Sequence, residues 1–193
     1  MGSDIIETSV FIVIDQSLSL RGLQISSAYT ATMELVEMIE EDCETWGREI
    51  VGDILFMGTG DDGNGCEWLC GDTVPFGDIH DSIEKEFQAN GHTPLLDSID
   101  KVADRISEKA IRQDGTIVLF ITDGEFGYLI PDDVRGSIVR IGDCRRMMLL
   151  VGDAYDDDIV RELTSSPDYV FRNGNHHGVF NAIIDTIERG SAR

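Results

Sequence analysis

The chain carries near its start the stretch Phe11-Ile12-Val13-Ile14-Asp15-Gln16-Ser17-Leu18-Ser19. Its apolar part is rich in β-branched residues, has no charge and ends abruptly at an acid. Such a run is typical of a strand buried on both faces, as central strands of parallel sheets are. Asp15 then stands where the strand leaves the sheet, which is the edge at which open α/β sheets bind their ligands.

One carboxylate and two hydroxyls therefore share a tight loop at residues 15–19. Oxygen donors of this kind suit Mg²⁺ or Mn²⁺. The same residue types also end strands and cap helices in ordinary turns, so the loop alone does not separate a metal site from a turn. The remaining ligands have to come from elsewhere in the chain.

Apolar runs alternate with segments of helical periodicity along the whole sequence. The expected strands are 10–14, 50–57, 66–70, 116–122, 147–151 and 169–172. The expected helices are 24–45, 77–88, one that starts at Pro94 behind a Thr93 cap, one from about 131, 156–163 and a last one around 179–187. This alternation predicts a doubly wound, mostly parallel sheet of about six strands, with helices on both faces. The length of 193 residues fits one domain, residues 1–193.

The charge balance excludes several classes of partner. The chain has 37 acidic and 15 basic side chains, for a net charge of -22. A field of that sign repels nucleic acid and anionic membrane surfaces. No apolar run reaches the roughly 20 residues of a membrane span, and no basic signal-peptide start is present, so we expect a cytoplasmic protein. We expect its four cysteines to be free thiols.

Further oxygen donors follow two other elements. Thr93 lies in Gly91-His92-Thr93 before a helix, and Asp123 lies in Thr122-Asp123-Gly124 after a buried strand. Together with the Asp15-x-Ser17-x-Ser19 loop, they resemble the metal-ion-dependent adhesion site of von Willebrand factor type A domains, the integrin I-domain type. The resemblance covers nearly the whole chain, and it points to an intracellular bacterial or phage type. The chain departs from the usual pattern at Leu18 and Leu20.

The resemblance implies a specific site and mode of action. The metal ligands would be Asp15, Ser17, Ser19, Thr93 and Asp123. They would hold Mg²⁺ or Mn²⁺ in preference to Ca²⁺, and the cation would receive an Asp or Glu side chain of a partner protein. Rim residues for that partner would be His92, Glu125 and Tyr128. The protein would then be a binding module and not an enzyme.

Two alternatives stay open. An acid after an apolar strand also suggests a Mg²⁺-dependent phosphotransferase of the haloacid dehalogenase type. That chemistry normally has a second acid two residues on, where this chain has Ser17, and a distal lysine, while lysines are scarce here. The other alternative is an interaction scaffold that binds partners without metal. The sequence names neither the partner nor the oligomeric state.

Overall fold

A seven-stranded sheet forms the centre of the protein, in the order β3-β2-β1-β5-β6-β7, with β4 paired to β2. The computed structural model describes residues 8–60, 62–83, 87–89, 91–109, 111–172 and 174–191. The strands are β1 (Ser9–Asp15), β2 (Val51–Thr59), β3 (Gly65–Trp68), β4 (Val74–Pro75), β5 (Thr116–Thr122), β6 (Arg145–Leu150) and β7 (Val170–Arg172). Strands β1, β2, β5, β6 and β7 run parallel, while β3 and β4 pair antiparallel with β2.

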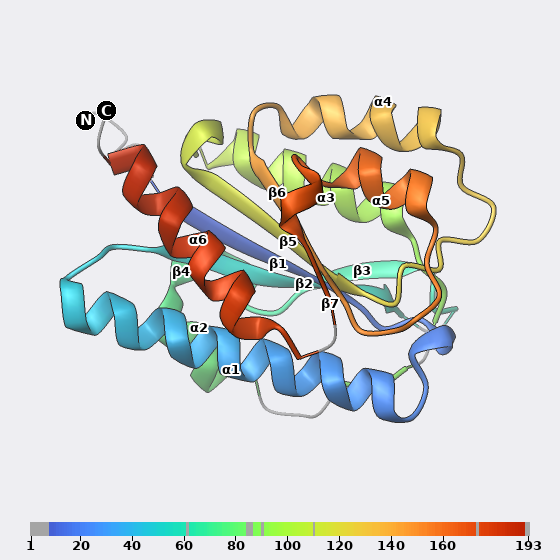
Figure 1. Ribbon diagram of the computed structural model, residues 1–193, viewed down its shortest axis with the longest axis horizontal. Helices are drawn as coiled ribbons and strands as arrows, with labels where there is room; N and C mark the ends of the chain where they lie inside the picture. Colours follow the sequence, from blue (N-terminus) through green and yellow to red (C-terminus); the bar gives the residue numbers. More distant parts are fainter. Residues whose placement is uncertain are drawn as a thin grey trace.

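Within the described ranges, six α-helices cover the two faces of this sheet (Figure 1). They are α1 (Leu23–Trp46), α2 (Phe76–Ser82), α3 (Leu95–Glu108), α4 (Pro131–Ile141), α5 (Asp157–Leu163) and α6 (His176–Ser191). Helices α1, α2 and α6 lie on one face and α3, α4 and α5 on the other. None of the helices in the described ranges combines the length and apolar character needed to cross a membrane.

Strand β1 joins two separate cores because its side chains alternate between the faces of the sheet. Val10, Ile12 and Ile14 pack with α1 and α6, whereas Phe11 and Val13 pack with α3 and α4. Every residue of β1 is buried. Burial on both faces explains why its sequence is continuously apolar rather than alternating.

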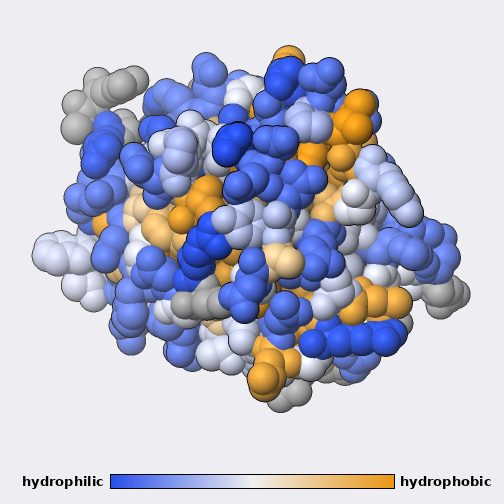
Figure 2. Space-filling view, turned by 45° about the vertical axis from the view of Figure 1, so that its right-hand side comes forward, coloured by the Kyte–Doolittle hydropathy of each residue, from blue (hydrophilic) through white to orange (hydrophobic). Residues whose placement is uncertain are grey.

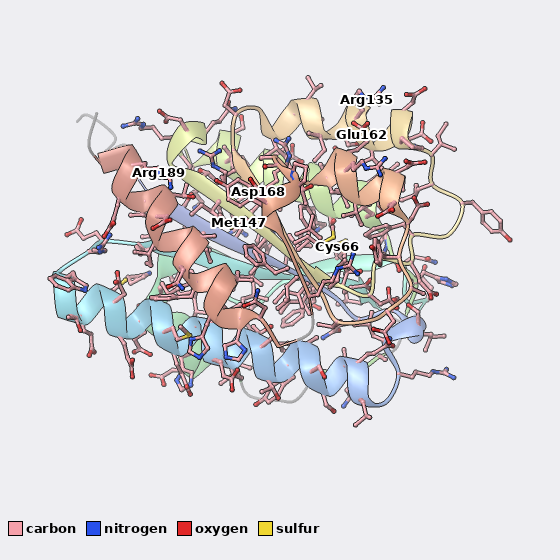
Figure 3. The ribbon with its side chains drawn as sticks, in the orientation of Figure 1. Cys66, Arg135, Met147, Glu162, Asp168 and Arg189 are labelled. Atoms are coloured by element: carbon pink, nitrogen blue, oxygen red, sulfur yellow. The ribbon has the colours of Figure 1, made fainter. Side chains whose placement is uncertain are left out.

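Ion pairs between helices reinforce the outer layer on the α3–α4–α5 face. Figure 3 shows Arg135 of α4 and Glu162 of α5 pointing toward each other, and their charged atoms lie 2.5 Å apart. Both side chains are at the surface, where one such pair contributes little to stability. The apolar cores therefore hold the layers together.

The predicted fold class is confirmed, and the differences are local. Strand β4 was not predicted, because two residues carry no periodic signal. Helix α2 was expected to reach Gln88, but it ends at Ser82. Residues 84–86 of the expected helix lie outside the described residues, as does Ala110, which the sequence predicts on the apolar face of the helix after Thr93.

The predicted cap of α3 is wrong. The N-cap is Pro94, whose φ and ψ of -76° and 63° are not helical and whose carbonyl accepts the N–H of Ser98. Thr93 lies one residue before the cap, and its side chain makes no cap hydrogen bond. The hydroxyl of Thr93 is therefore not used by the helix.

The carboxyl ends of β1 and β5 form a topological switch point. The two strands are neighbours, with Ile14 opposite Ile121. After β1 the chain leaves toward α1 on one face, and after β5 it leaves toward α4 on the other. Connections that part in this way leave a crevice at the strand ends, where open α/β sheets bind ligands.

Candidate metal site

Asp15 is the deepest polar group at this switch point. Its side chain is fully buried at the last position of β1. Its Oδ1 accepts the backbone N–H of Ser17 at 2.9 Å, and its Oδ2 accepts the hydroxyl of Thr122 at 2.7 Å. These two bonds fix the carboxylate in orientation and leave lone pairs on both oxygens.

Burial without a compensating cation disfavours the charge of Asp15. In the described part of the chain, no Lys, Arg or His forms an ion pair with this carboxylate. The pKa of Asp15 is raised from 3.8 to about 6, chiefly by desolvation and to a smaller extent by the nearby carboxylate of Asp123. The hydrogen bonds from Thr122 and Ser17 act in the opposite direction. A bound cation would remove this penalty, because it attracts the ionised form.

Ser17 and Ser19 follow on the loop above Asp15. Their hydroxyl oxygens lie 2.8 Å apart, with Ser17 buried and Ser19 exposed. One of the two donates to the other, so each oxygen keeps acceptor capacity. The two serine hydroxyls therefore lie next to each other as possible oxygen ligands.

The Gly91-His92-Thr93 segment is held against this loop by backbone contacts. Ser17 and Gly91 form a parallel bridge, in which Leu18 N donates to Gly91 O at 2.8 Å. A side chain at Gly91 would bring its Cβ to 2.4 Å from the carbonyl oxygen of Gly58. Glycine is therefore required where the loop carrying Thr93 passes over the end of β2.

Asp123 and Thr122 come from the end of β5. Asp123 is buried, and its Oδ1 accepts the N–H of Glu125 at 3.0 Å. Thr122 donates to Asp15 and accepts the N–H of Gly124 at 3.0 Å. Thr122 thus ties the two strand ends together.

A surface hollow of about 320 Å³ opens at this position. It is lined by residues from three loops: Ser17, Leu18, Ser19, Gly91, His92, Thr93, Glu125, Phe126 and Gly127. The three predicted hydroxyl ligands share this hollow, whereas Asp15 and Asp123 lie buried at the strand ends. Of the predicted rim residues, His92 and Glu125 line the hollow, and Tyr128 stands outside it with a fully exposed side chain.

The arrangement fits a hard divalent cation. Two carboxylates and three hydroxyls supply oxygen only, and water can complete the coordination shell of Mg²⁺ or Mn²⁺. No group of three or more His, Cys, Asp or Glu side chains suited to a metal occurs among the residues described. A site built largely from hydroxyls differs from such clusters, as it does from zinc sites made of thiolates and imidazoles.

Two functional features were missed at the sequence level. The first is the hydroxyl of Thr122, which a buried strand ending in Thr-Asp could have suggested. The second is the close approach of Gly58 and Gly91, which no local pattern indicates because it joins residues far apart in the sequence.

Comparison with known proteins identifies the fold. No family model and no curated protein matches the sequence. A solved structure of von Willebrand factor type A from Catenulispora acidiphila superimposes with a TM-score of 0.67 at 14% identity, over 96% of this chain and 42% of that chain. The chain has the von Willebrand factor A fold.

Two further solved structures share this fold, and both carry a metal ion. Proximal thread matrix protein 1 from the mussel byssus, with a zinc-occupied adhesion motif, has a TM-score of 0.67 at 12% identity, over 95% of this chain and 48% of that chain. Manganese-loaded TRAP protein of Plasmodium vivax has a TM-score of 0.60 at 13% identity, over 94% of this chain and 73% of that chain. This chain spans less than half the length of the first two matches. At these identities the likeness establishes the fold.

Proposed function

We propose that this protein is a divalent-cation-dependent module that binds another protein through an Asp or Glu side chain of that partner. The cation is Mg²⁺ or Mn²⁺, and its ligands are Asp15, Ser17, Ser19, Thr93 and Asp123. The single observation that supports this most strongly is the buried carboxylate of Asp15, which pairs with no basic side chain in the described part of the chain and adjoins a hollow lined by three hydroxyl side chains.

Each residue has a distinct part in this proposal. Ser17, Ser19 and Thr93 offer their hydroxyls at the surface, while Asp15 and Asp123 provide negative charge below. The bound cation supplies a local positive centre that attracts one more anionic oxygen. Such a centre is needed here, because a net charge of -22 would otherwise repel an acidic partner.

The site is tested by isothermal titration calorimetry of chelator-stripped protein with Mg²⁺ and Mn²⁺. We expect the native chain to bind and the variant Ser17→Ala/Ser19→Ala to lose binding. The matched control is Ser107→Ala/Ser137→Ala, which removes two hydroxyls that do not line the hollow. Equal binding by the native chain and the Ser17→Ala/Ser19→Ala variant would refute the assignment.

The phosphotransferase alternative is tested in the same preparations. Hydrolysis of a simple aryl phosphate in Mg²⁺, abolished by Asp15→Asn, would favour that enzyme over a binding module. We expect no such turnover, since Ser17 stands where the second acid of that chemistry would be.

We also propose that residues 1–193 form one domain and that the protein acts in the cytoplasm. The four cysteines support the second proposal, because all are free thiols in the structure. Disulfides are rare in reducing compartments.

A further inference from the structure

Several exposed apolar residues belong to the two segments that leave the sheet at the candidate metal site. Among the described residues, the large hydrophobic side chains at the surface are Leu18, Leu23, Trp46, Tyr128, Ile130 and Val139. The first two belong to the segment that follows β1, and Tyr128 and Ile130 belong to the loop that follows β5. Both segments leave the sheet at the switch point.

The other two mark the far end of the molecule. Trp46 ends α1, which starts at the site and extends for about 36 Å at 1.5 Å per residue. Val139 lies near the end of α4 and lines a different hollow, together with Arg145 at the start of β6. They serve as an internal reference for exposed apolar residues that are remote from the hollow.

The apolar residues continue into the hollow itself. Leu18 is one of its lining residues, as is Phe126, which is almost fully buried. Figure 2, with the site end of the molecule turned forward, shows separate hydrophobic patches among hydrophilic side chains. Leu23 and Tyr128 extend this apolar character outward, because both residues are almost entirely exposed.

The exposure of Tyr128 has no explanation in the stability of the fold. A side chain that is fully exposed buries no area against the rest of the protein and contributes nothing to either core. Tyrosine is enriched at the centres of protein interfaces, where its ring supplies contact area and its hydroxyl a hydrogen bond. Apolar residues gathered around a polar site are typical of a protein-binding surface.

Charge restricts what this surface can bind. The net charge of -22 and the exposed carboxylate of Glu125 on the wall of the hollow oppose a partner rich in acids. One cation compensates one incoming carboxylate and leaves further acids repelled. The residues on either side of that carboxylate are then not acidic, and the apolar border favours apolar side chains at these positions.

From these observations we infer that the partner is a protein segment in which one acidic residue is flanked by apolar residues. Its carboxylate enters the hollow, and its apolar side chains cover Leu18, Leu23, Tyr128 and Ile130. This inference rests on the proposed function, because the acid is placed by the cation.

The test uses short synthetic peptides with a fixed central Glu and randomised neighbours, selected on the full chain in Mn²⁺ and, separately, in chelator. We expect selection in Mn²⁺ to enrich Leu, Ile, Phe and Tyr beside the Glu. The affinity of a selected peptide is then measured for Leu23→Ser/Tyr128→Ser and for the control Trp46→Ser/Val139→Ser. We expect the first variant to bind about tenfold more weakly, as for loss of interface anchors, and the control to stay within about twofold. Because all four side chains are exposed, both variants should melt like the native chain.

The outcomes separate this inference from the proposed function. Mn²⁺-dependent binding of Glu peptides with no apolar preference, or with the same affinity for Leu23→Ser/Tyr128→Ser, would overturn the inference and leave the metal module intact. Binding of apolar peptides that persists in chelator and after Glu→Gln would overturn the metal-dependent function and the acid in the inferred segment. Absence of any selected peptide from metal-loaded protein would overturn the inference.

Discussion

Two buried carboxylates on neighbouring strands have opposite surroundings. Asp53 on β2 and Asp15 on β1 are both fully buried. Asp53 accepts N–H bonds from Ile54 and Cys70, and its Oδ2 lies 3.3 Å from the guanidinium of Arg105. Asp15 has a hydroxyl and one N–H as donors, and its charged neighbour is another carboxylate.

This difference distinguishes an acid that stabilises the fold, Asp53, from an acid that is a candidate for binding a ligand, Asp15. Burial raises the pKa of both groups, but the protein supplies Asp53 with its own cation. Arg105 is itself buried, and its guanidinium lies 4.3 Å from the centre of the Trp68 ring, so that pair is complete. The charge of Asp15 has no basic partner among the described residues, and this acid lies at the sheet edge where the hollow opens. A buried acid in that condition is a candidate for a functional site.

Removing Arg105 should give the largest effect on stability. The change Arg105→Met leaves the Asp53 carboxylate buried and unpaired, which typically costs about 3–5 kcal/mol. Urea unfolding at neutral pH measures the loss. The double variant Asp53→Asn/Arg105→Met should recover much of it, because Asn still accepts the N–H bonds and carries no charge.

The control for this change is Arg140→Met. Arg140 is half-exposed and pairs with Asp104 of α3 at 2.7 Å. Exposed pairs contribute about 0–1 kcal/mol, so this variant should be close to native. A loss at Arg140 as large as that at Arg105 would contradict the view that burial makes the Asp53 pair different.

Asp15 should produce the next largest effect, as a dependence of stability on pH. Its pKa of about 6 in the folded protein exceeds the ordinary value of 3.8, so between these pH values the folded state binds more protons than the unfolded state. Stability from this group is therefore full below about pH 4 and is lost as pH rises through about 6, by about 3 kcal/mol. Unfolding of metal-free protein between about pH 4 and 8 should show this decline.

The variant Asp15→Asn isolates that contribution. Asp53 also has a raised pKa and adds a slope of the same sign, but it is present in both proteins. The difference between the native chain and Asp15→Asn should therefore change between about pH 4 and 7 and be constant above. Saturating Mg²⁺ should flatten the native decline, because the cation binds the ionised carboxylate. A parallel pH profile for the two metal-free proteins would show that Asp15 is not perturbed.

The sequence was enough to predict the strands that carry Asp15 and Asp53. It did not predict that only Asp53 has a basic partner. The apolar runs that end at Asp15 and Thr122 predict buried parallel strands, and periodicity predicts α1 within one residue at each end. Strands buried on both faces have few other possible positions in a sheet. The placement of Asp15 at a sheet edge follows directly from that pattern.

Contacts between distant segments were beyond the sequence. Nothing near Asp53 indicates that Arg105, on α3, reaches across to it, and nothing near Thr93 indicates that Pro94 replaces it as the helix cap. The approach of Gly91 to Gly58 likewise depends on tertiary packing. Local sequence patterns predict a helix or strand well. The tertiary contacts of that element depend on how all the helices and strands pack together.

Substitution of Thr122 should give the smallest change in stability, and it is the most specific test of how Asp15 differs from Asp53. Thr122→Val keeps the shape of the side chain and removes the hydroxyl that Asp15 Oδ2 accepts. Thr116→Val is the matched control at the other end of the same strand, where an equally buried hydroxyl bonds to Ser9. Each variant should lose about 1–2 kcal/mol in unfolding at neutral pH.

The two losses should differ in their dependence on pH. A hydrogen bond to an ionised acceptor is worth more than one between neutral groups, so the loss in Thr122→Val should grow as pH rises through about 6 and Asp15 ionises. The hydroxyl lowers the pKa of Asp15, so its removal should also shift that transition upward. The hydroxyl of Thr116 bonds to Ser9 and to the Arg112 carbonyl, and it also contacts the Cys144 thiol, whose pKa burial raises to about 12. None of these groups titrates near pH 6, so the loss in its variant should stay constant with pH. Identical pH profiles for the two variants would mean that Thr122 only fills space. A profile that steepens for Thr122→Val alone would identify its hydroxyl as the group that keeps Asp15 available as an anion for the cation.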